Sequence, residues 1–252
     1  MSNLALVLTL VFVGITMLLS MKQKLGLEKD ILIGTIRATV QLLAVGYVLQ
    51  FVFATEQVLL VIVIIGVMIL VATWNAAQRA KGVTGVFWRI AVAIVCTEII
   101  TLGLLLVLQI IEPTARYMIP LSGMIIGNAM VACGLFLNQM KREVESMRGE
   151  IETYLALGAT TRQAIHPVMK RSVKFSMIPT IDTMKTVGIV QLPGMMTGMI
   201  IAGANPVEAV RYQLLIVFSL SASAAIASMI LSFLSDRLWF TADTRLRQTL
   251  KS

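Results

Sequence analysis

The chain has 252 residues, of which 58% are hydrophobic and only 13% are charged. A soluble domain typically carries about 25% charged residues, so this composition indicates a surface that faces lipid and excludes a sizeable soluble domain. The net charge of +8 is explained by basic loops beside anionic lipid headgroups, and we expect the bilayer rather than a nucleic acid as the partner of this charge.

Seven apolar runs cross, or nearly cross, a hydrocarbon core about 30 Å thick, which takes about 20 helical residues. They cover residues 4–21, 31–53, 58–74, 90–111, 117–137, 187–204 and 214–234. Backbone groups in hydrocarbon must bond internally, so these runs predict helices. We expect an all-α polytopic membrane protein with one transmembrane domain over residues 1–252. The first run lacks a preceding basic residue and a following cleavage pattern, which favours a retained span over a signal peptide.

Basic residues alternate between the two sides of these runs. Most of the 21 Lys and Arg residues lie in four connecting or terminal segments, which are 22–30, 75–89, 138–174 and 235–252. The exceptions are Arg37, Arg116, Lys185 and Arg211. By the positive-inside rule, the four segments face the cytoplasm, the N-terminus lies outside and the C-terminus is cytoplasmic. We expect this topology in the plasma (inner) membrane.

The longest polar segment, 138–174, predicts a helix–turn–helix in the cytoplasm. Helical spacing places a set of apolar residues on one face, namely Val144, Met147, Ile151, Tyr154 and Leu155. Gly158 is where a C′ glycine would end the first helix, and Thr160 with Gln163 would form a capping box for the second. The apolar face has no core of its own, so it either docks on a partner or lies on the headgroups or on the chain's own bundle.

The sixth apolar run is interrupted, which makes it the best candidate for a substrate site. Pro179 and the pair Pro193 and Gly194 are incompatible with one unbroken helix. Membrane proteins tolerate such breaks where the freed backbone groups line a cavity. Freed carbonyls and Asp182 are hard oxygen donors for a cation such as iron(II), and Asn128 could join them from a neighbouring helix.

Charged and sulfur-containing residues near membrane depth each leave two interpretations open. Asp182 and Lys185 lie three residues apart and can pair on one helix face. They either neutralise each other or line the substrate path, and Glu98 likewise either pairs with Arg37 or serves the path. The thioethers of Met195 and Met196 either fill packing gaps or bind a soft metal. The candidate metal ligands are therefore Asp182, Met195 and Met196.

The sequence contains no G-x-x-x-x-G-K-[ST] phosphate-binding motif. We therefore expect a transport protein that is not an enzyme and binds no cofactor, with energy supplied by a partner or by an ion gradient. A membrane enzyme or scaffold is the remaining alternative, but no catalytic constellation at membrane depth supports it.

Residues 152–160 (ETYLALGAT) resemble the EAA loop of ATP-binding-cassette permeases, a coupling helix that docks into the ATPase. Thr153 and Tyr154 depart from that motif, in which two alanines occupy these positions. The resemblance implies a set of coupling residues, namely Glu152, Leu157, Gly158, Ala159 and Thr160.

A longer resemblance covers most of the chain. The stretches that carry it are 27–32 (LEKDIL), 37–49 (RATVQLLAVGYVL), 119–131 (IPLSGMIIGNAMV) and 178–200 (IPTIDTMKTVGIVQLPGMMTGMI). Together they resemble the FetB family of permeases, which includes bacterial iron-export permeases and the membrane partners in plant aluminium tolerance. This implies a seven-span permease that forms a homodimer and exports iron or another metal ion. A separate cytoplasmic ATPase would hold ATP and Mg. Export of a non-metal substrate and an ion-gradient-driven carrier remain as alternatives.

Overall fold

The computed structural model describes residues 8–55, 57–79, 85–241, 243 and 245–247. The start of the first predicted span, residues 4–7, and the basic residues Lys81 and Lys251 lie outside the described residues. The chain divides into two compact units, 1–57 and 58–252, and each is described by itself.

The first unit is a helical hairpin of α2 (Leu10–Lys22) and α3 (Glu28–Thr55). Its turn is held by Ser20, whose hydroxyl donates to Oε1 of Glu28 at 2.8 Å and accepts from the amide of Leu27 at 3.3 Å. Gly26 takes the left-handed conformation in this turn, with φ of +70°. The two apolar runs predicted here are therefore helices, of which α2 has 13 residues.

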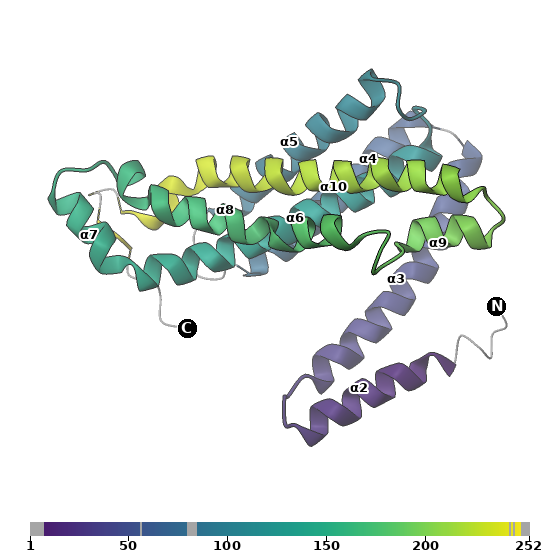
Figure 1. The fold of residues 1–252 in the computed structure, drawn as a ribbon, viewed down its shortest axis with the longest axis horizontal. Coiled ribbons are helices and arrows are strands. Elements are labelled where there is room, and N and C mark those ends of the chain that lie inside the picture. The colour runs from purple at the N-terminus through teal and green to yellow at the C-terminus, as the bar shows by residue number, and fades with distance from the viewer. Residues whose placement is uncertain (1–7, 56, 80–84, 242, 244, 248–252) are drawn as a thin grey trace. The chain divides into compact units, whose positions relative to one another are not determined.

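The second unit is a bundle built around two long helices (Figure 1). Its elements are α4 (Val58–Arg79), α5 (Val86–Val107), α6 (Ala115–Ser146), α7 (Arg148–Ala156), α8 (Thr161–Thr186), α9 (Gly194–Ile201), α10 (Pro206–Ser235) and the 3₁₀-helix η1 (Asp236–Trp239). α6 packs against α4, α5, α8 and α10, while α10 also packs against α5, α8 and α9. These two helices therefore form the centre to which the others are attached.

Small residues and interhelical hydrogen bonds hold this bundle together, as is usual for helices that pack within a membrane. Arg79 of α4 lies so close to Gly134 of α6 that a Cβ at Gly134 would be 2.9 Å from the Arg79 Cδ. The buried hydroxyl of Ser176 on α8 donates to that of Ser228 on α10 at 2.9 Å. Packing between these helices therefore depends on particular small residues.

Five helices of the described chain are long and apolar enough to cross a membrane, namely α3, α4, α5, α6 and α10. The predicted sixth run, 187–204, does not reach spanning length, because it holds a tight turn and the eight-residue α9. The predicted break at Pro193 is present, but α8 already ends at Thr186. α8 continues through Pro179, so Pro179 and Pro193 belong to different helices and the interruption lies between them. A proline removes one helical hydrogen bond, and neighbouring helices can compensate for that loss.

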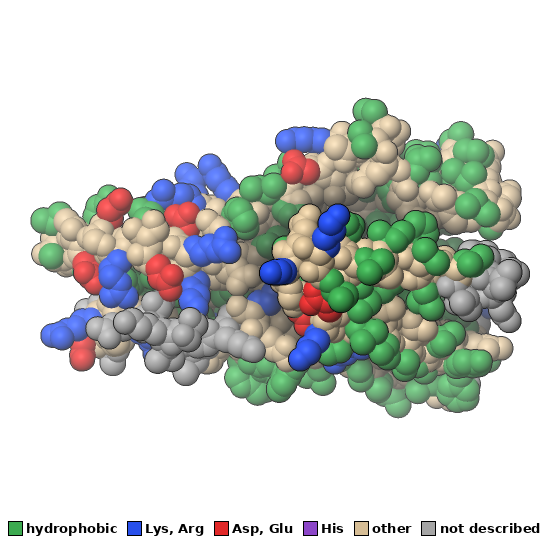
Figure 2. Space-filling model, turned by 90° about the horizontal axis from the view of Figure 1, so that it is seen from below, with side chains coloured by type: hydrophobic (Ala, Val, Ile, Leu, Met, Phe, Trp, Pro, Cys, Tyr) green, Lys and Arg blue, Asp and Glu red, His purple; other side chains and the backbone are tan. Residues whose placement is uncertain are grey.

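The apolar face predicted within residues 144–155 packs against the core of the bundle. Val144 and Ile151 are buried in the main hydrophobic cluster of the bundle, together with Ile165 of α8 and with Phe240 and Leu246 near the C-terminus. Of the two alternatives, the chain's own bundle covers this face. Charged side chains gather around this end of the second unit, where α7 lies (Figure 2).

Candidate functional site

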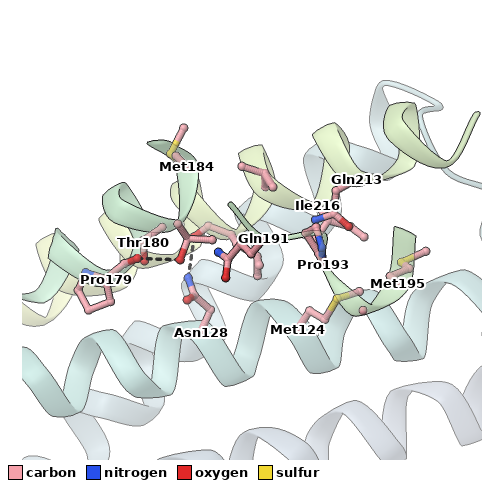
Figure 3. Close-up of a pocket in the computed structure, with 14 residues that line it drawn as sticks. Met124, Asn128, Pro179, Thr180, Met184, Gln191, Pro193, Met195, Gln213 and Ile216 are labelled. Atoms are coloured by element: carbon pink, nitrogen blue, oxygen red, sulfur yellow. Dashed lines mark hydrogen bonds between the residues drawn. The ribbon is translucent and has the colours of Figure 1, made fainter. Parts of the chain in front are cut away.

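A cavity of about 340 Å³ opens in the second unit next to the end of α8. Its walls come from α6, α8, the loop 187–193, the start of α9 and α10 (Figure 3). The lining residues are Met124, Asn128, Pro179, Thr180, Thr183, Met184, Gln191, Pro193, Gly194, Met195, Gln213, Ile216, Val217 and Leu220. A mainly apolar hollow with a few converging polar groups is the usual form of a small-ligand site.

The loop 187–193 forms one wall because it folds back on itself where α8 ends. The amide of Gly188 donates to the carbonyl of Gln191 at 3.0 Å, and Gly188 adopts a φ of +83° that favours glycine. Pro193 then precedes α9, and its carbonyl accepts the amide of Thr197 at 3.0 Å. Hydrogen bonds within the turn and α9 therefore occupy these two backbone carbonyls.

One face of α8 supplies the second wall. Pro179, Thr180, Thr183 and Met184 line the cavity, and their spacing along the helix places them on adjoining positions of one side. The Thr183 hydroxyl donates to the carbonyl of Pro179 at 2.9 Å, which occupies it within the helix. The thioether of Met184 and the hydroxyl of Thr180 are the other polar atoms that this face brings to the cavity.

Two amides of the lining have different surroundings. Nδ2 of Asn128 donates to the carbonyl of Leu220 at 2.7 Å and to the hydroxyl of Ser223 at 3.0 Å, which ties α6 to α10. Gln213 is only 7% exposed, and its Oε1 has no hydrogen-bond partner among the described residues. A buried acceptor without a partner is costly, so Gln213 is the lining group with an unmet demand for a donor or a cation.

None of the lining residues carries a formal charge. The available donor atoms are amide and hydroxyl oxygens, which suit hard cations, and the thioethers of Met124, Met184 and Met195, which suit soft ones. The cavity can therefore surround an uncharged solute, or a cation with neutral ligands only.

The predicted charged pair lies elsewhere. Asp182 and Lys185 pair along α8 at 3.8 Å, with side chains 63% and 70% exposed, and neither lines the cavity. Met196 does not line it either, whereas Met195 does. The predicted metal ligands are therefore not brought together. The described residues also contain no cluster of three or more His, Cys, Asp or Glu side chains that could hold a metal.

Of the predicted substrate-path residues, the cavity brings together Asn128, Pro193, Gly194 and Met195. Glu98 lies apart from them, buried on α5. The predicted pair of Glu98 with Arg37 would join the two units and stays a prediction.

Sequence reasoning missed the two glutamines of the lining, Gln191 and Gln213. Gln213 lies one residue before the predicted seventh span, 214–234, and therefore outside the predicted helices. In the structure α10 already begins at Pro206, so Gln213 is a buried residue of this helix. A glutamine inside a long apolar helix is the signal that would have identified it.

The predicted coupling residues surround the turn between α7 and α8. Gly158 has φ of +87°, and the amides of Gly158 and Ala159 donate to the carbonyls of Leu155 and Tyr154, both at 3.0 Å. This is the Schellman pattern of a glycine-terminated helix.

The second helix of this turn begins with the predicted capping box, which the structure confirms: the amide of Gln163 donates to the Thr160 hydroxyl, and the Gln163 side chain accepts the amide of Thr160. The turn carries an exposed apolar residue, Leu157, which is 80% accessible to solvent. Glu152 is held by Arg148 at 3.3 Å.

Residues 3–240 match the family described as "Uncharacterised protein family (UPF0014)". The chain belongs to this family. A relative in Bacillus subtilis (strain 168), "UPF0014 membrane protein YjkA", is 49% identical over 98% of this chain and 99% of its own length. The resemblance that the sequence motifs indicated is thereby confirmed.

Two further UPF0014 relatives carry more specific names. "Probable iron export permease protein FetB" of Escherichia coli (strain K12) is 40% identical over 96% of this chain and 93% of its own length. "Protein ALUMINUM SENSITIVE 3" of Arabidopsis thaliana is 38% identical over 92% of this chain and 85% of its own length. No solved structure matches the chain. The family and the apolar helices together make this a multi-pass membrane protein.

Proposed function

We propose that this chain is the membrane-spanning permease of an ATP-driven exporter of a metal ion, with iron as the first candidate. The observation that carries the proposal is the 40% identity, over 96% of the chain, to a protein named as a probable iron export permease. Two copies of the chain in the plasma membrane would work with a cytoplasmic ATPase, which would bind the ATP and Mg that this chain has no motif to hold.

The cargo would pass through the cavity between α6, α8, α9 and α10. Transport sites in membrane proteins commonly lie where a helix is interrupted, and the cavity adjoins the loop that separates α8 from α9. Neutral ligands favour release, because a transported ion must bind strongly enough to enter and weakly enough to leave. Gln213 and Met195 are the first ligands that we would test.

The α7–α8 turn is the proposed ATPase contact, and α8 connects it to the cavity. α8 is one helix of 26 residues, about 39 Å long at 1.5 Å per residue. It begins next to Thr160 in the turn and carries Pro179, Thr180, Thr183 and Met184 in the cavity wall. A displacement of the turn by the ATPase would therefore move one wall of the cavity directly, without an intervening loop.

The test uses the purified permease reconstituted into vesicles with a candidate cytoplasmic ATPase from the same organism, and measures ATP-dependent iron(II) transport. Leu157→Asp replaces the exposed apolar side chain of the turn with a charge, and we expect it to abolish both coupled transport and co-purification of the ATPase. Leu157→Met is the matched control, which keeps an apolar side chain of similar size and should retain both. Coupled transport at the wild-type rate in Leu157→Asp would contradict the coupling role.

The same vesicles separate this proposal from an ion-gradient-driven carrier. That alternative predicts transport without ATP, which collapses when the proton or sodium gradient is dissipated. Transport that requires ATP and survives loss of the gradient would exclude it.

A further inference from the structure

Glu98 is a buried acid to which the proposed transport path assigns no role. It lies in the middle of α5, is 4% exposed, and neither carboxylate oxygen has a hydrogen-bond partner among the described residues. No ion pair of the described chain includes it. An intramembrane acid without a cation needs a physical reason, because its ionised form loses both water and counter-charge.

The carboxyl of Glu98 lies between two apolar clusters and next to one buried hydroxyl. On α5, Ile94 belongs to one cluster, whereas Leu102 and Leu105 belong to the other, and Glu98 lies between them. Ser122 of α6 is fully buried, and its hydroxyl interacts with the Glu98 carboxylate without reaching full hydrogen-bond geometry.

Elsewhere in the second unit, the hydroxyls of Thr101 on α5 and Thr73 on α4 are also buried and have no hydrogen-bond partner among the described residues. A hydroxyl such as that of Ser122 can donate or accept as the state of the acid requires.

The helices that pack against α5 are α4, α6 and α10, and their charged groups lie toward the helix ends. These groups are Arg79 of α4, Arg116 and the 141–145 stretch of α6, and Glu208 and Arg211 of α10. The titratable groups are Tyr117 and Cys133 of α6 and Tyr212 of α10. Tyr117 is the nearest of these to Ser122 along α6, about 7.5 Å away at 1.5 Å per residue. None of them forms an ion pair or hydrogen bond with Glu98.

We propose that Glu98 is a proton-binding site within the bundle, which holds a proton in this arrangement of helices and releases it when a rearrangement admits water. The neutral carboxyl can donate to the Ser122 hydroxyl, whereas the carboxylate would have no cation partner among the described residues of the second unit. Release leaves a carboxylate and transfers the proton to water, with no redox change. The site is separate from the cavity residues and does not depend on which cargo the cavity accepts.

The test is carbodiimide labelling of the purified full chain in vesicles, read by mass spectrometry, since dicyclohexylcarbodiimide reacts with protonated carboxyls in apolar surroundings. We expect an adduct on Glu98 that declines as the pH rises, and no adduct at this position in Glu98→Gln. Glu145, an exposed acid on α6, is the internal control and should remain unlabelled. Equal labelling of Glu98 and Glu145 would overturn the proposal.

A second measurement covers the case in which the reagent cannot reach the site. The infrared spectrum of the wild type should contain a protonated-carboxyl carbonyl band that is missing in Glu98→Gln, and its absence from the wild type would overturn the proposal.

Arg37→Gln tests the predicted alternative partner of Glu98. If the wild type is unlabelled and Arg37→Gln is labelled, then Arg37 neutralises Glu98 and the proposal is wrong. None of these readouts requires transport, so they remain informative if the proposed function fails.

Discussion

At the scale of single residues, Asn128 and Gln213 illustrate a structural role and a ligand-binding role among the amides of the cavity. The Asn128 side chain already donates two hydrogen bonds to α10, so its removal should chiefly loosen the contact between α6 and α10. Gln213 has a buried oxygen that the protein does not satisfy. A group that folding leaves unsatisfied is better explained by a ligand than by packing.

Gln213→Leu is the corresponding experiment. Replacing an unsatisfied buried amide with an apolar side chain of similar size should leave the thermal stability unchanged or raise it, because the desolvation cost disappears. If Gln213 contacts the cargo, loss of one hydrogen bond of about 1 kcal/mol should weaken apparent affinity roughly fivefold. Melting temperature and transport titrations measure the two effects separately.

Asn128→Ala is the comparison for this prediction. It should lower the melting temperature, because it removes two hydrogen bonds between helices. A Gln213→Leu protein that is destabilised as strongly as Asn128→Ala, with unchanged apparent affinity, would assign Gln213 to packing.

At the scale of elements, the sequence could predict helix ends that local backbone chemistry determines, but not features that depend on neighbouring helices. Gly158 and the Thr160 capping box were predictable because local backbone chemistry determines them. The continuation of α8 through Pro179 was not, because it depends on how neighbouring helices compensate for a missing amide. The burial of Val144 and Ile151 could not be predicted from the sequence either, because the residues that cover them come from α8 and the C-terminal segment.

The same distinction applies to the cavity. The sequence identified Pro193 and Met195 from an interrupted apolar run and Asn128 from a neighbouring helix, and the structure places all three in the cavity lining. It could not exclude Asp182, because a shift of one or two residues along a helix decides whether a side chain faces the cavity or the surface. Which face of a helix is turned toward the cavity depends on how the helix packs against its neighbours.

Gly158→Ala tests the turn as an element. A left-handed conformation costs an alanine about 1–2 kcal/mol, although nothing lies within 4 Å of a Cβ at this position. We expect a lower melting temperature and weaker coupling to the ATPase, without any steric clash. Gly149→Ala is the matched control, because Gly149 is also open but lies within α7 outside the left-handed region. It should leave the stability unchanged or raise it. Equal stability of the two variants would contradict the role given to the turn.

At the scale of the whole molecule, the distribution of charge predicts which end of the second unit faces the cytoplasm. The basic residues of the second unit gather around the α7 end, which the positive-inside rule assigns to the cytoplasm (Figure 2). α6 is long and apolar enough to cross the membrane between that end and the loop before Ala115. The loop should therefore face the outside, as should the start of α10.

Single-cysteine labelling in intact cells tests this orientation. In a background of Cys96→Ser and Cys133→Ala, we expect Glu112→Cys and Glu208→Cys to react with an impermeant maleimide from outside. Leu157→Cys and Glu145→Cys should react only after the membrane is permeabilised, because α6 and α10 each separate the two pairs by one crossing. All four native side chains are exposed, so accessibility within the fold does not limit the reaction. Reaction of Leu157→Cys in intact cells would place the α7–α8 turn outside the cell, where a cytoplasmic ATPase cannot bind it, and would contradict the proposed coupling role.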